Sequence, residues 1–277
     1  GLGILKRMLG DGKRRILIGV PKQPIADAWV NAARDFFGIK INKLSSTSDA
    51  GKGVVVTTYA NMGDNTALAK ESWDAFFMDE AHYLASNQQG DTTKALAMLN
   101  ALGRKTDAAG DLARLRNYEL FARIEELNKR ATSLRRQDND NTRAEESEIE
   151  KELERLYQER NEALEAAKDE VAGTADDEKP RSVFLSATPF AYEKNVRWAQ
   201  EWLFDWNPKN PSGRMGENGY NSGSNYDRFM MTHFGYRMRY NKLTEPDSKV
   251  DRGLMQRAFN TWLRKEGVLS ARALDSD

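Results

Sequence analysis

Residues 73–84 read WDAFFMDEAHYL. They begin with an apolar and aromatic run, Ala75 to Met78, that is too short for an independent helix and suits a buried strand. The run stops at two adjacent carboxylates, Asp79 and Glu80. Ligands of α/β sheets bind at the carboxyl ends of the strands. The sequence therefore predicts a functional site at the end of this strand.

Two acids at a strand end have distinct uses when a phosphate ligand lies beside them. One carboxylate can hold a hydrated Mg²⁺ that bridges two phosphates, and the other can orient the water that attacks. Successive residues of a strand point to opposite faces, so Asp79 and Glu80 can serve both roles. The alternative is that the two acids only end the strand and cap the next helix.

The run Asp79-Glu80-Ala81-His82 after an apolar strand resembles the Walker B element, or motif II, of superfamily 2 helicases and translocases. A second element, VFLSATP at residues 183–189, resembles motif III of the same family, which is a buried strand ending in Ser-Ala-Thr. The two elements also occur in the order that the family shows.

The resemblance covers roughly residues 1–105 and 180–205 and implies the first RecA-like motor domain of such an enzyme. The fold class that it implies is α/β, with a mostly parallel sheet and helices on both faces. It also implies ATP and Mg²⁺ as cofactors and DNA as the partner, with RNA as an open alternative.

The family's catalytic roles transfer to five residues of this sequence. Asp79 would anchor Mg²⁺ through water, and Glu80 would polarise the attacking water. His82, Ser186 and Thr188 would couple the state of the nucleotide to the grip on nucleic acid.

Two other strand ends resemble the nucleic-acid contacts of the family. Side chains there would touch phosphates without reading the base sequence. A solvated loop lysine and a plain strand cap are the respective alternatives. The residues concerned are Pro21, Lys22 and Gln23, which resemble motif Ia, and Thr57, Thr58 and Tyr59, which resemble motif Ib of double-stranded-DNA translocases.

The sequence departs from the family in two places. No Gly-x-x-x-x-Gly-Lys-Ser/Thr phosphate loop occurs in it, although residues 1–9 have the pattern of the helix that follows this loop. Nothing in it resembles motifs IV to VI and their arginine finger. We therefore expect a fragment that is inactive by itself, with the phosphate loop upstream and the second motor domain missing from this chain.

Residues 111–173 have a different composition, dominated by Leu, Ala, Glu, Arg and Lys. Apolar side chains recur there every three or four residues on both sides of a turn signal at 137–142. The pattern predicts an inserted antiparallel helical hairpin, a coiled coil of two helices of about 25 residues each. It would be an arm that touches DNA or a protein partner, or a solvated spacer.

These patterns divide the chain into three parts. Residues 1–110 and 174–206 form the RecA-like domain, and 111–173 form the hairpin. Residues 207–277 are an irregular linker and a C-terminal helical segment. Within them, residues 229–242 interleave aromatic and basic side chains, which is typical of nucleic-acid binding and also of a covering strand or helix.

Composition limits the remaining classes of function. Lys+Arg and Asp+Glu are equal at 42 each, so the net charge does not favour nucleic acid as a partner. The absence of cysteine excludes disulfides and thiolate metal sites and favours a reducing, cytoplasmic location. Two histidines are too few for a histidine metal cluster, and no apolar run has the length of a membrane span.

The sequence thus predicts the first motor domain of an ATP-dependent superfamily 2 DNA helicase. Two alternatives stay open. The first is a translocase that moves on double-stranded DNA without unwinding it, as in restriction or remodelling systems. The second is a nucleic-acid-binding or scaffold module in which the ATPase motifs are vestigial.

Overall fold

The computed structural model of the chain describes residues 1–85, 91–186, 198–204 and 225–267. It divides into two compact units, residues 1–189 and 190–277. The first unit includes both the sheet and the inserted helices, and the second begins earlier than the expected position 207. We describe each unit by itself.

The first unit is built on a five-stranded sheet in which every pair of neighbours is parallel, in the order β2-β3-β1-β4-β5. An α/β fold with a parallel sheet is therefore confirmed. The strands are β1 (Ile16–Val20), β2 (Ile41–Lys43), β3 (Val54–Thr58), β4 (Ala75–Asp79) and β5 (Arg181–Leu185). The apolar runs of β1, β3 and β4 are buried along most of their length, as expected for strands covered on both faces.

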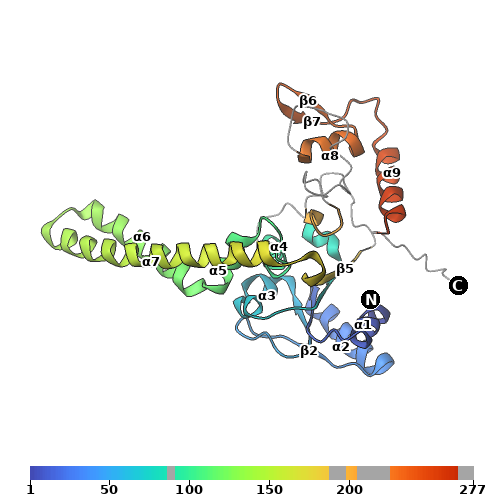
Figure 1. Cartoon of the computed structure of the whole chain (residues 1–277), viewed down its shortest axis with the longest axis horizontal. Helices are drawn as coiled ribbons and strands as arrows, with labels where there is room; N and C mark the ends of the chain where they lie inside the picture. Colours follow the sequence, from blue (N-terminus) through green and yellow to red (C-terminus); the bar gives the residue numbers. More distant parts are fainter. Residues whose placement is uncertain (86–90, 187–197, 205–224, 268–277) are drawn as a thin grey trace. The chain divides into compact units, whose positions relative to one another are not determined.

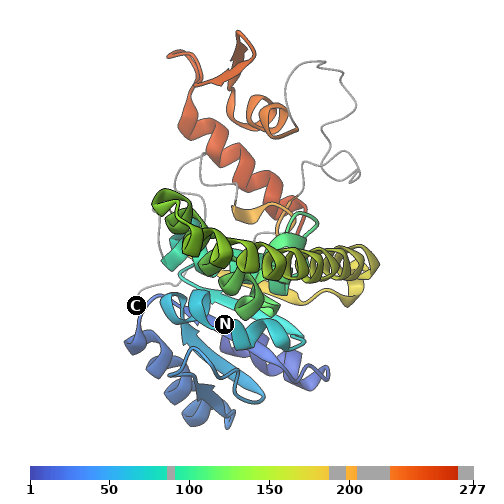
Figure 2. The same ribbon diagram turned by 90° about the vertical axis from the view of Figure 1, so that its left-hand side faces the viewer.

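Helices connect these strands and cover the sheet, as the two views of the ribbon show for this unit (Figure 1 and Figure 2). The helices of the first unit are α1 (Leu2–Gly10), α2 (Gln23–Phe37), α3 (Tyr59–Asp64), α4 (Asp91–Leu102), α5 (Ala109–Arg116), α6 (Tyr118–Gln137) and α7 (Asp140–Gly173). Three short 3₁₀ turns accompany them: η1 (Thr66–Lys70), η2 (Ala81–Ala85) and η3 (Asp176–Glu178).

The two faces of the sheet are covered by different helices. On one face, Leu5 of α1 and Trp29 of α2 belong to the same buried cluster as Ile18 and Phe77. On the other face, α3 approaches β1 so closely that a Cβ added to Gly19 would lie 2.7–2.8 Å from side chains of α3 and β4. Helices on both faces were predicted, and glycine at this position is required by the close approach.

The side chain of Asp74, which directly precedes β4, connects the beginning of β4 with the beginning of β1. A carboxylate oxygen of Asp74 accepts hydrogen bonds from the backbone N–H groups of Arg14 and Arg15, each at 2.8 Å. The Arg15 guanidinium also donates to the Ala50 and Gly51 carbonyls and lies 4.4 Å from the Trp73 ring. These contacts hold β1, β3 and β4 in register at their starts.

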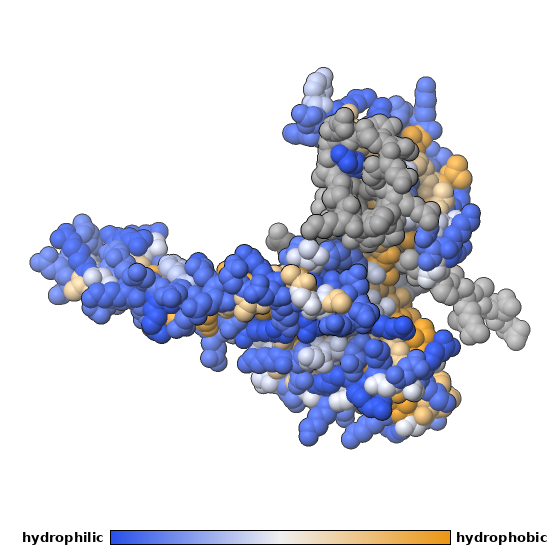
Figure 3. All heavy atoms as spheres, viewed as in Figure 1, coloured by the Kyte–Doolittle hydropathy of each residue, from blue (hydrophilic) through white to orange (hydrophobic). Residues whose placement is uncertain are grey.

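The inserted helices α6 and α7 pack along a seam of their own apolar side chains. The seam contains Ile124, Leu127, Ala131 and Leu134 from α6 and Ile149, Leu153 and Leu156 from α7. On the face seen in Figure 3, most of the surface of this pair is hydrophilic. The two helices have 20 and 34 residues rather than about 25 each. Coiled-coil geometry stays a prediction.

Sequence features at the turn explain why α6 ends and α7 begins there. Asp138 has a left-handed backbone, with φ 41°, and closes α6. Asn139 then caps α7, because its side chain accepts from the Thr142 N–H while the Thr142 hydroxyl accepts from the Asn139 N–H. This reciprocal capping box fixes a two-residue connection.

The base of the insertion is tied to the sheet domain by an ion-pair cluster. Glu170 of α7 binds Arg116 of α5 and, at 3.2 Å, Arg104, and Arg116 also donates to the Ala69 carbonyl at 2.9 Å. Burial opposes ionisation of Glu170, but the Arg116 and Arg104 guanidinium groups outweigh it and lower the pKa of this carboxyl. The α5 helix therefore belongs to the base, and the projecting part begins at α6.

The second unit is smaller and has an aromatic core. Its elements are α8 (Asn225–Phe234), β6 (Arg237–Arg239), β7 (Lys242–Thr244) and α9 (Arg252–Lys265). His233 packs against the rings of Phe229, Phe259 and Trp262, with centroids 4.6–5.3 Å apart. Burial lowers the pKa of His233 to about 4, so this histidine is a neutral core residue at physiological pH.

Among the described residues of both units, no helix is both long enough and apolar enough to cross a bilayer.

We expect Glu170→Gln to destabilise the first unit by about 1–3 kcal/mol at pH 7, because the two arginines lose a charged hydrogen-bond partner. Since the pKa of Glu170 is lowered on folding, this contribution is present above the unfolded pKa of about 4.3 and is lost as the pH falls below it. Urea denaturation at pH 7 and pH 3 measures both effects. Glu165→Gln, on the exposed part of α7, is the control and should change little. Equal effects of the two substitutions would contradict a clamping role for Glu170.

Candidate active site

The parallel sheet brings the predicted functional residues to a single edge. Asp79 is the last residue of β4 and lies opposite Leu185 of β5, so Ser186 follows at the same level. Thr58 ends β3, and Pro21 follows the end of β1. The predicted motifs II and III therefore lie on adjacent strands.

Asp79 is held by three hydrogen bonds from different parts of the chain. One carboxylate oxygen accepts the indole N–H of Trp29 at 2.8 Å, and the other accepts the backbone N–H of Glu80 at 2.9 Å. The backbone carbonyl of Asp79 accepts the phenol of Tyr59 at 2.5 Å. The carboxylate is therefore fixed in position before any ligand binds.

Tyr59 is buried beneath this strand end. Burial, followed by the charges of Asp79 and Glu80, raises the pKa of its phenol well above the ordinary value. The group is therefore a protonated donor at physiological pH. The sequence had suggested Tyr59 as a nucleic-acid contact, but its side chain points to Asp79 and is only 2% exposed.

Glu80 differs from Asp79 in both exposure and backbone. Its side chain is 44% exposed, and its φ of 51° lies in the left-handed region. Non-glycine residues rarely adopt this conformation, and those that do cluster at functional turns. The turn leaves the Glu80 carboxylate partly exposed to solvent, beside His82.

His82 links the two motifs. Its Nδ1 atom lies 3.0 Å from the Ser186 hydroxyl and 3.4 Å from a carboxylate oxygen of Glu80. The serine and the histidine are 104 residues apart in the sequence. One imidazole ring thus contacts both the end of β5 and Glu80. Thr188, the third predicted coupling residue, lies outside the described residues.

The other predicted nucleic-acid contacts have mixed surroundings. Lys22 and Gln23 are exposed at the start of α2, beside the half-buried Pro21. The Thr57 hydroxyl accepts from the Asn61 side chain at 2.8 Å, and the Thr58 hydroxyl caps α3 by accepting from the Asn61 N–H. Thr57 is only 1% exposed, so its side chain, like that of Tyr59, is buried rather than at the surface. A contact of Pro21, Lys22, Gln23 and Thr58 with nucleic acid stays a prediction.

A hollow of about 510 Å³ lies beside Asp79. It is lined partly by the first turn of α1 and partly by α2 and β5. The residues that matter here are Gly1, Leu2, Gly3, Trp29, Asp79 and Leu185. The unsatisfied N–H groups of a helix start favour anions, and in this unit such a helix start faces a fixed carboxylate that could share a metal ion with a phosphate.

A single fixed carboxylate such as Asp79 is a type of ligand that Mg²⁺ accepts. No group of three or more His, Cys, Asp or Glu side chains in the described ranges could hold a metal ion. Mg²⁺ needs no such cage, because it keeps several waters and binds through one or two carboxylates together with phosphate oxygens. Asp79 could supply that carboxylate.

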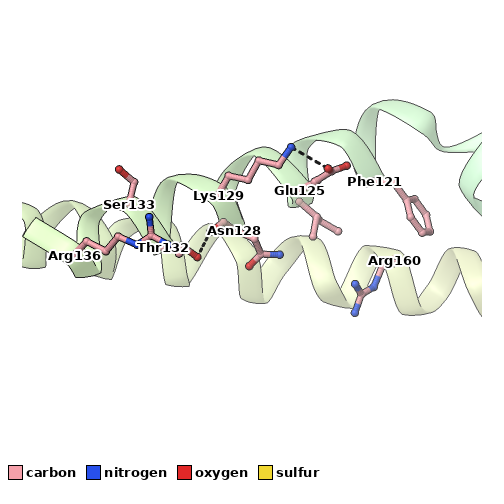
Figure 4. A pocket seen from close by; sticks show the side chains of 9 residues that line it. Phe121, Glu125, Asn128, Lys129, Thr132, Ser133, Arg136 and Arg160 are labelled. Atoms are coloured by element: carbon pink, nitrogen blue, oxygen red, sulfur yellow. Dashed lines mark hydrogen bonds and ion pairs between the residues drawn. The ribbon is translucent and has the colours of Figure 1, made fainter.

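A second hollow, of about 540 Å³, is formed by α6 and α7 alone (Figure 4). It is a groove lined by both apolar and charged side chains, in which Lys129 is already paired with Glu125 at 3.1 Å. Arg160 lies over the Tyr157 ring, and its Nε atom has no hydrogen-bond partner in the described part of the chain. Among the residues that line this groove, no carboxylate accepts hydrogen bonds on both of its oxygens as Asp79 does. Binding of a protein partner to this hairpin stays a prediction.

Sequence reasoning missed Trp29. Its position in an amphipathic helix predicted only a core residue, and it does pack edge-on against Phe77. Nothing in the local sequence indicates that its N–H reaches a carboxylate 50 residues away.

Comparison with known proteins adds nothing to this assignment, because no family model and no curated protein matches the chain. The candidate site therefore rests on its own residues and geometry.

We predict that Trp29 and Asp79 are energetically coupled. Trp29→Phe keeps the aromatic packing but removes the N–H, and Asp79→Asn removes the charge that accepts it. In a double-mutant cycle of unfolding free energies, the coupling should be about 1–3 kcal/mol, the range for hydrogen bonds to charged groups. Trp29→Phe paired with Asp64→Asn, an exposed acid on α3, is the control and should be additive. Additivity in the first pair as well would mean that the hydrogen bond is not formed in solution.

Proposed function

We propose that this chain is the first motor domain of an ATP-dependent DNA helicase or translocase of superfamily 2, with a RecA-like sheet. The single observation that carries the proposal is the hydrogen bond between His82 and Ser186. Two motif resemblances that are far apart in the sequence fall on adjacent strands and touch. Two chance resemblances would have no reason to meet in this way.

The strand order also supports a RecA-like assignment. In the family, the strand that enters the phosphate loop lies beside the motif III strand. Within the described residues, β5 pairs only with β4, and its other edge carries no strand. The hollow at the start of α1 lies on the same side as this edge, next to Leu185 and Asp79. The proposed nucleotide would lie with its phosphates toward this hollow.

The proposed division of labour follows from the different surroundings of the two acids. Asp79 is immobilised by donors on both carboxylate oxygens, which suits a group that must hold a hydrated Mg²⁺ in one place. Glu80 is exposed and has no hydrogen-bond donor fixing its carboxylate other than the nearby His82 within the described residues. That freedom suits a group that orients water. Bound ATP would supply the phosphoryl group that this water attacks.

The coupling role is proposed for His82 with Ser186. A change at the nucleotide would act on Glu80 and reach β5 through the imidazole. Thr188, together with the strand-end residues Lys22 and Thr58, would contact or sense the nucleic acid in this proposal. We favour the motor over a vestigial scaffold because both the fixed acid and the exposed acid have the surroundings that their chemistry requires.

The catalytic assignment is tested in a polypeptide that joins this chain to a phosphate loop and a second motor domain. Glu80→Gln should retain Mg·ATP binding and lose turnover by about 10²-fold or more, because it removes the water-orienting group. Asp79→Asn should weaken Mg·ATP binding as well. Steady-state ATPase and nucleotide titration measure the two effects. Glu178→Gln, on the exposed η3 turn, is the charge-matched control. Normal turnover by Glu80→Gln would end the catalytic assignment.

The coupling assignment needs a different readout in the same polypeptide. Ser186→Ala should leave basal ATPase within a few-fold but reduce its stimulation by DNA by about 5- to 150-fold, the usual range of a coupling energy. Ser182→Ala, at the opposite end of the same strand, is the control and should keep the full stimulation. Equal loss of basal and stimulated rates in Ser186→Ala would show that the serine supports the site only structurally.

A further inference from the structure

The β6–β7 hairpin of the second unit has an unusual tip. Its strands are connected by only two residues, Tyr240 and Asn241, whose φ angles are 50° and 60°. Two-residue turns with positive φ at both positions favour Asn, Asp and Gly. Asn241 fits this preference, but a bulky tyrosine in the left-handed region is an outlier.

The tyrosine gains nothing from packing in this position. The relative exposure of Tyr240 is 100%, so its ring is entirely in solvent. The strained backbone at Tyr240 lowers the stability of the fold, and the exposed ring does not offset this by burying apolar surface. Such strain is characteristic of functional positions.

The charges beside the tip break a second local rule. Arg239 and Lys242 are directly opposite each other across the hairpin, and like charges in this position repel. Neither forms a direct ion pair within the part of the unit that the structure describes, although the charge of Arg239 contributes to lowering the pKa of the Asp247 carboxyl. The Asp247 carboxylate, by contrast, binds Arg237 at 3.3 Å and the Lys249 N–H at 3.2 Å.

The hairpin presents these groups on one face. Side chains alternate along each strand, so Arg237, Arg239 and Lys242 share a face, while Met238 and Leu243 lie on the other and are half-buried. Tyr236, which directly precedes β6 and comes two residues after the end of α8, is buried. The tip is therefore a small cationic platform on an anchored base.

We propose that this tip binds single-stranded nucleic acid, with Tyr240 stacking on a base and with Arg239 and Lys242 contacting the neighbouring phosphates. Every base has a flat π-face, so stacking on an aromatic ring tolerates any sequence. The two cations next to Tyr240, neither of which forms a direct ion pair among the described residues, match the phosphates that flank a base. The choice of nucleic acid as the partner rests on the proposed function, but the site uses neither Asp79 nor Glu80 and needs no nucleotide.

The surroundings of the ring argue against a membrane. An interfacial anchor needs several apolar side chains on one face. Here, the apolar Met238 and Leu243 lie on the face opposite the two cations, and the tip offers a single ring. A single ring between cations suits stacking on one base.

The test uses the whole 277-residue chain without nucleotide and measures fluorescence anisotropy of a labelled oligothymidylate of about 15 nucleotides. Tyr240→Asn should weaken binding by about 5- to 150-fold, because base stacking is lost. It should leave the melting temperature unchanged or higher, because asparagine tolerates the left-handed backbone. Tyr240→Phe keeps the ring and should bind within about twofold of the unaltered chain.

The cations are tested through the salt dependence of the same binding. The combined change Arg239→Gln with Lys242→Gln should make the slope of log K against log salt shallower by about 1.4, or 0.7 for each phosphate contact of a single strand. Lys249→Gln, an exposed lysine of the same unit, is the control and should leave the slope unchanged.

Three results would overturn the proposal. The first is no binding of the oligonucleotide by the unaltered chain at low salt, and the second is full binding by Tyr240→Asn. The third is binding to vesicles with anionic lipid that Tyr240→Asn abolishes while oligonucleotide binding persists, which would make the tip a membrane contact. A normal ATPase rate in Glu80→Gln would reject the catalytic proposal without changing these outcomes.

Discussion

The parallel pairing of β4 with β5 is the constraint on which the candidate site depends. Its register places Asp79 opposite Leu185, and Ser186 therefore reaches His82 at 3.0 Å. The side-chain period of a strand is two residues, so a slip of one residue would turn Ser186 to the other face of the sheet. The large insertion between the strands is compatible with this pairing because its base is clamped by Arg104 and Arg116 to Glu170.

The two acids of the site, Asp79 and Glu80, differ in how many hydrogen bonds hold their carboxylates. Asp79 receives hydrogen bonds from α2, from the following turn and, at its carbonyl, from α3. Tyr59 can come so close only because Gly19 on the neighbouring strand has no side chain. Glu80 stands one residue further along on a left-handed backbone and is open to solvent. In the function proposed above, a fixed carboxylate beside a more exposed one suits phosphoryl transfer, where catalysis depends mainly on positioning and charge.

The α6–α7 hairpin and the β6–β7 hairpin differ in how their exposed charged side chains are arranged. In α6 and α7, arginine–glutamate pairs such as Arg123–Glu152 and Arg130–Glu145 cross the helices, and an apolar seam lies between them. Opposite charges therefore face each other across this helical pair. The β6–β7 tip instead opposes two cations and exposes Tyr240 on a strained backbone. Natural sequences tend to break local rules where a function requires it, so the small hairpin is the better candidate for direct contact with a ligand.

The sequence alone determined those strands and turns that depend only on residues close to one another in the chain. Apolar runs fixed β1, β3 and β4, and the signal at Asp138 and Asn139 fixed the turn between α6 and α7, because capping and periodicity depend on near neighbours. The acids Asp79 and Glu80 were visible for the same reason. Only the tertiary structure decided the partners of these groups. Trp29 reaches Asp79, Tyr59 points inward rather than to the surface, and α5 joins the base of the insertion, since sheet order and helix packing bring distant segments together and no local pattern records that.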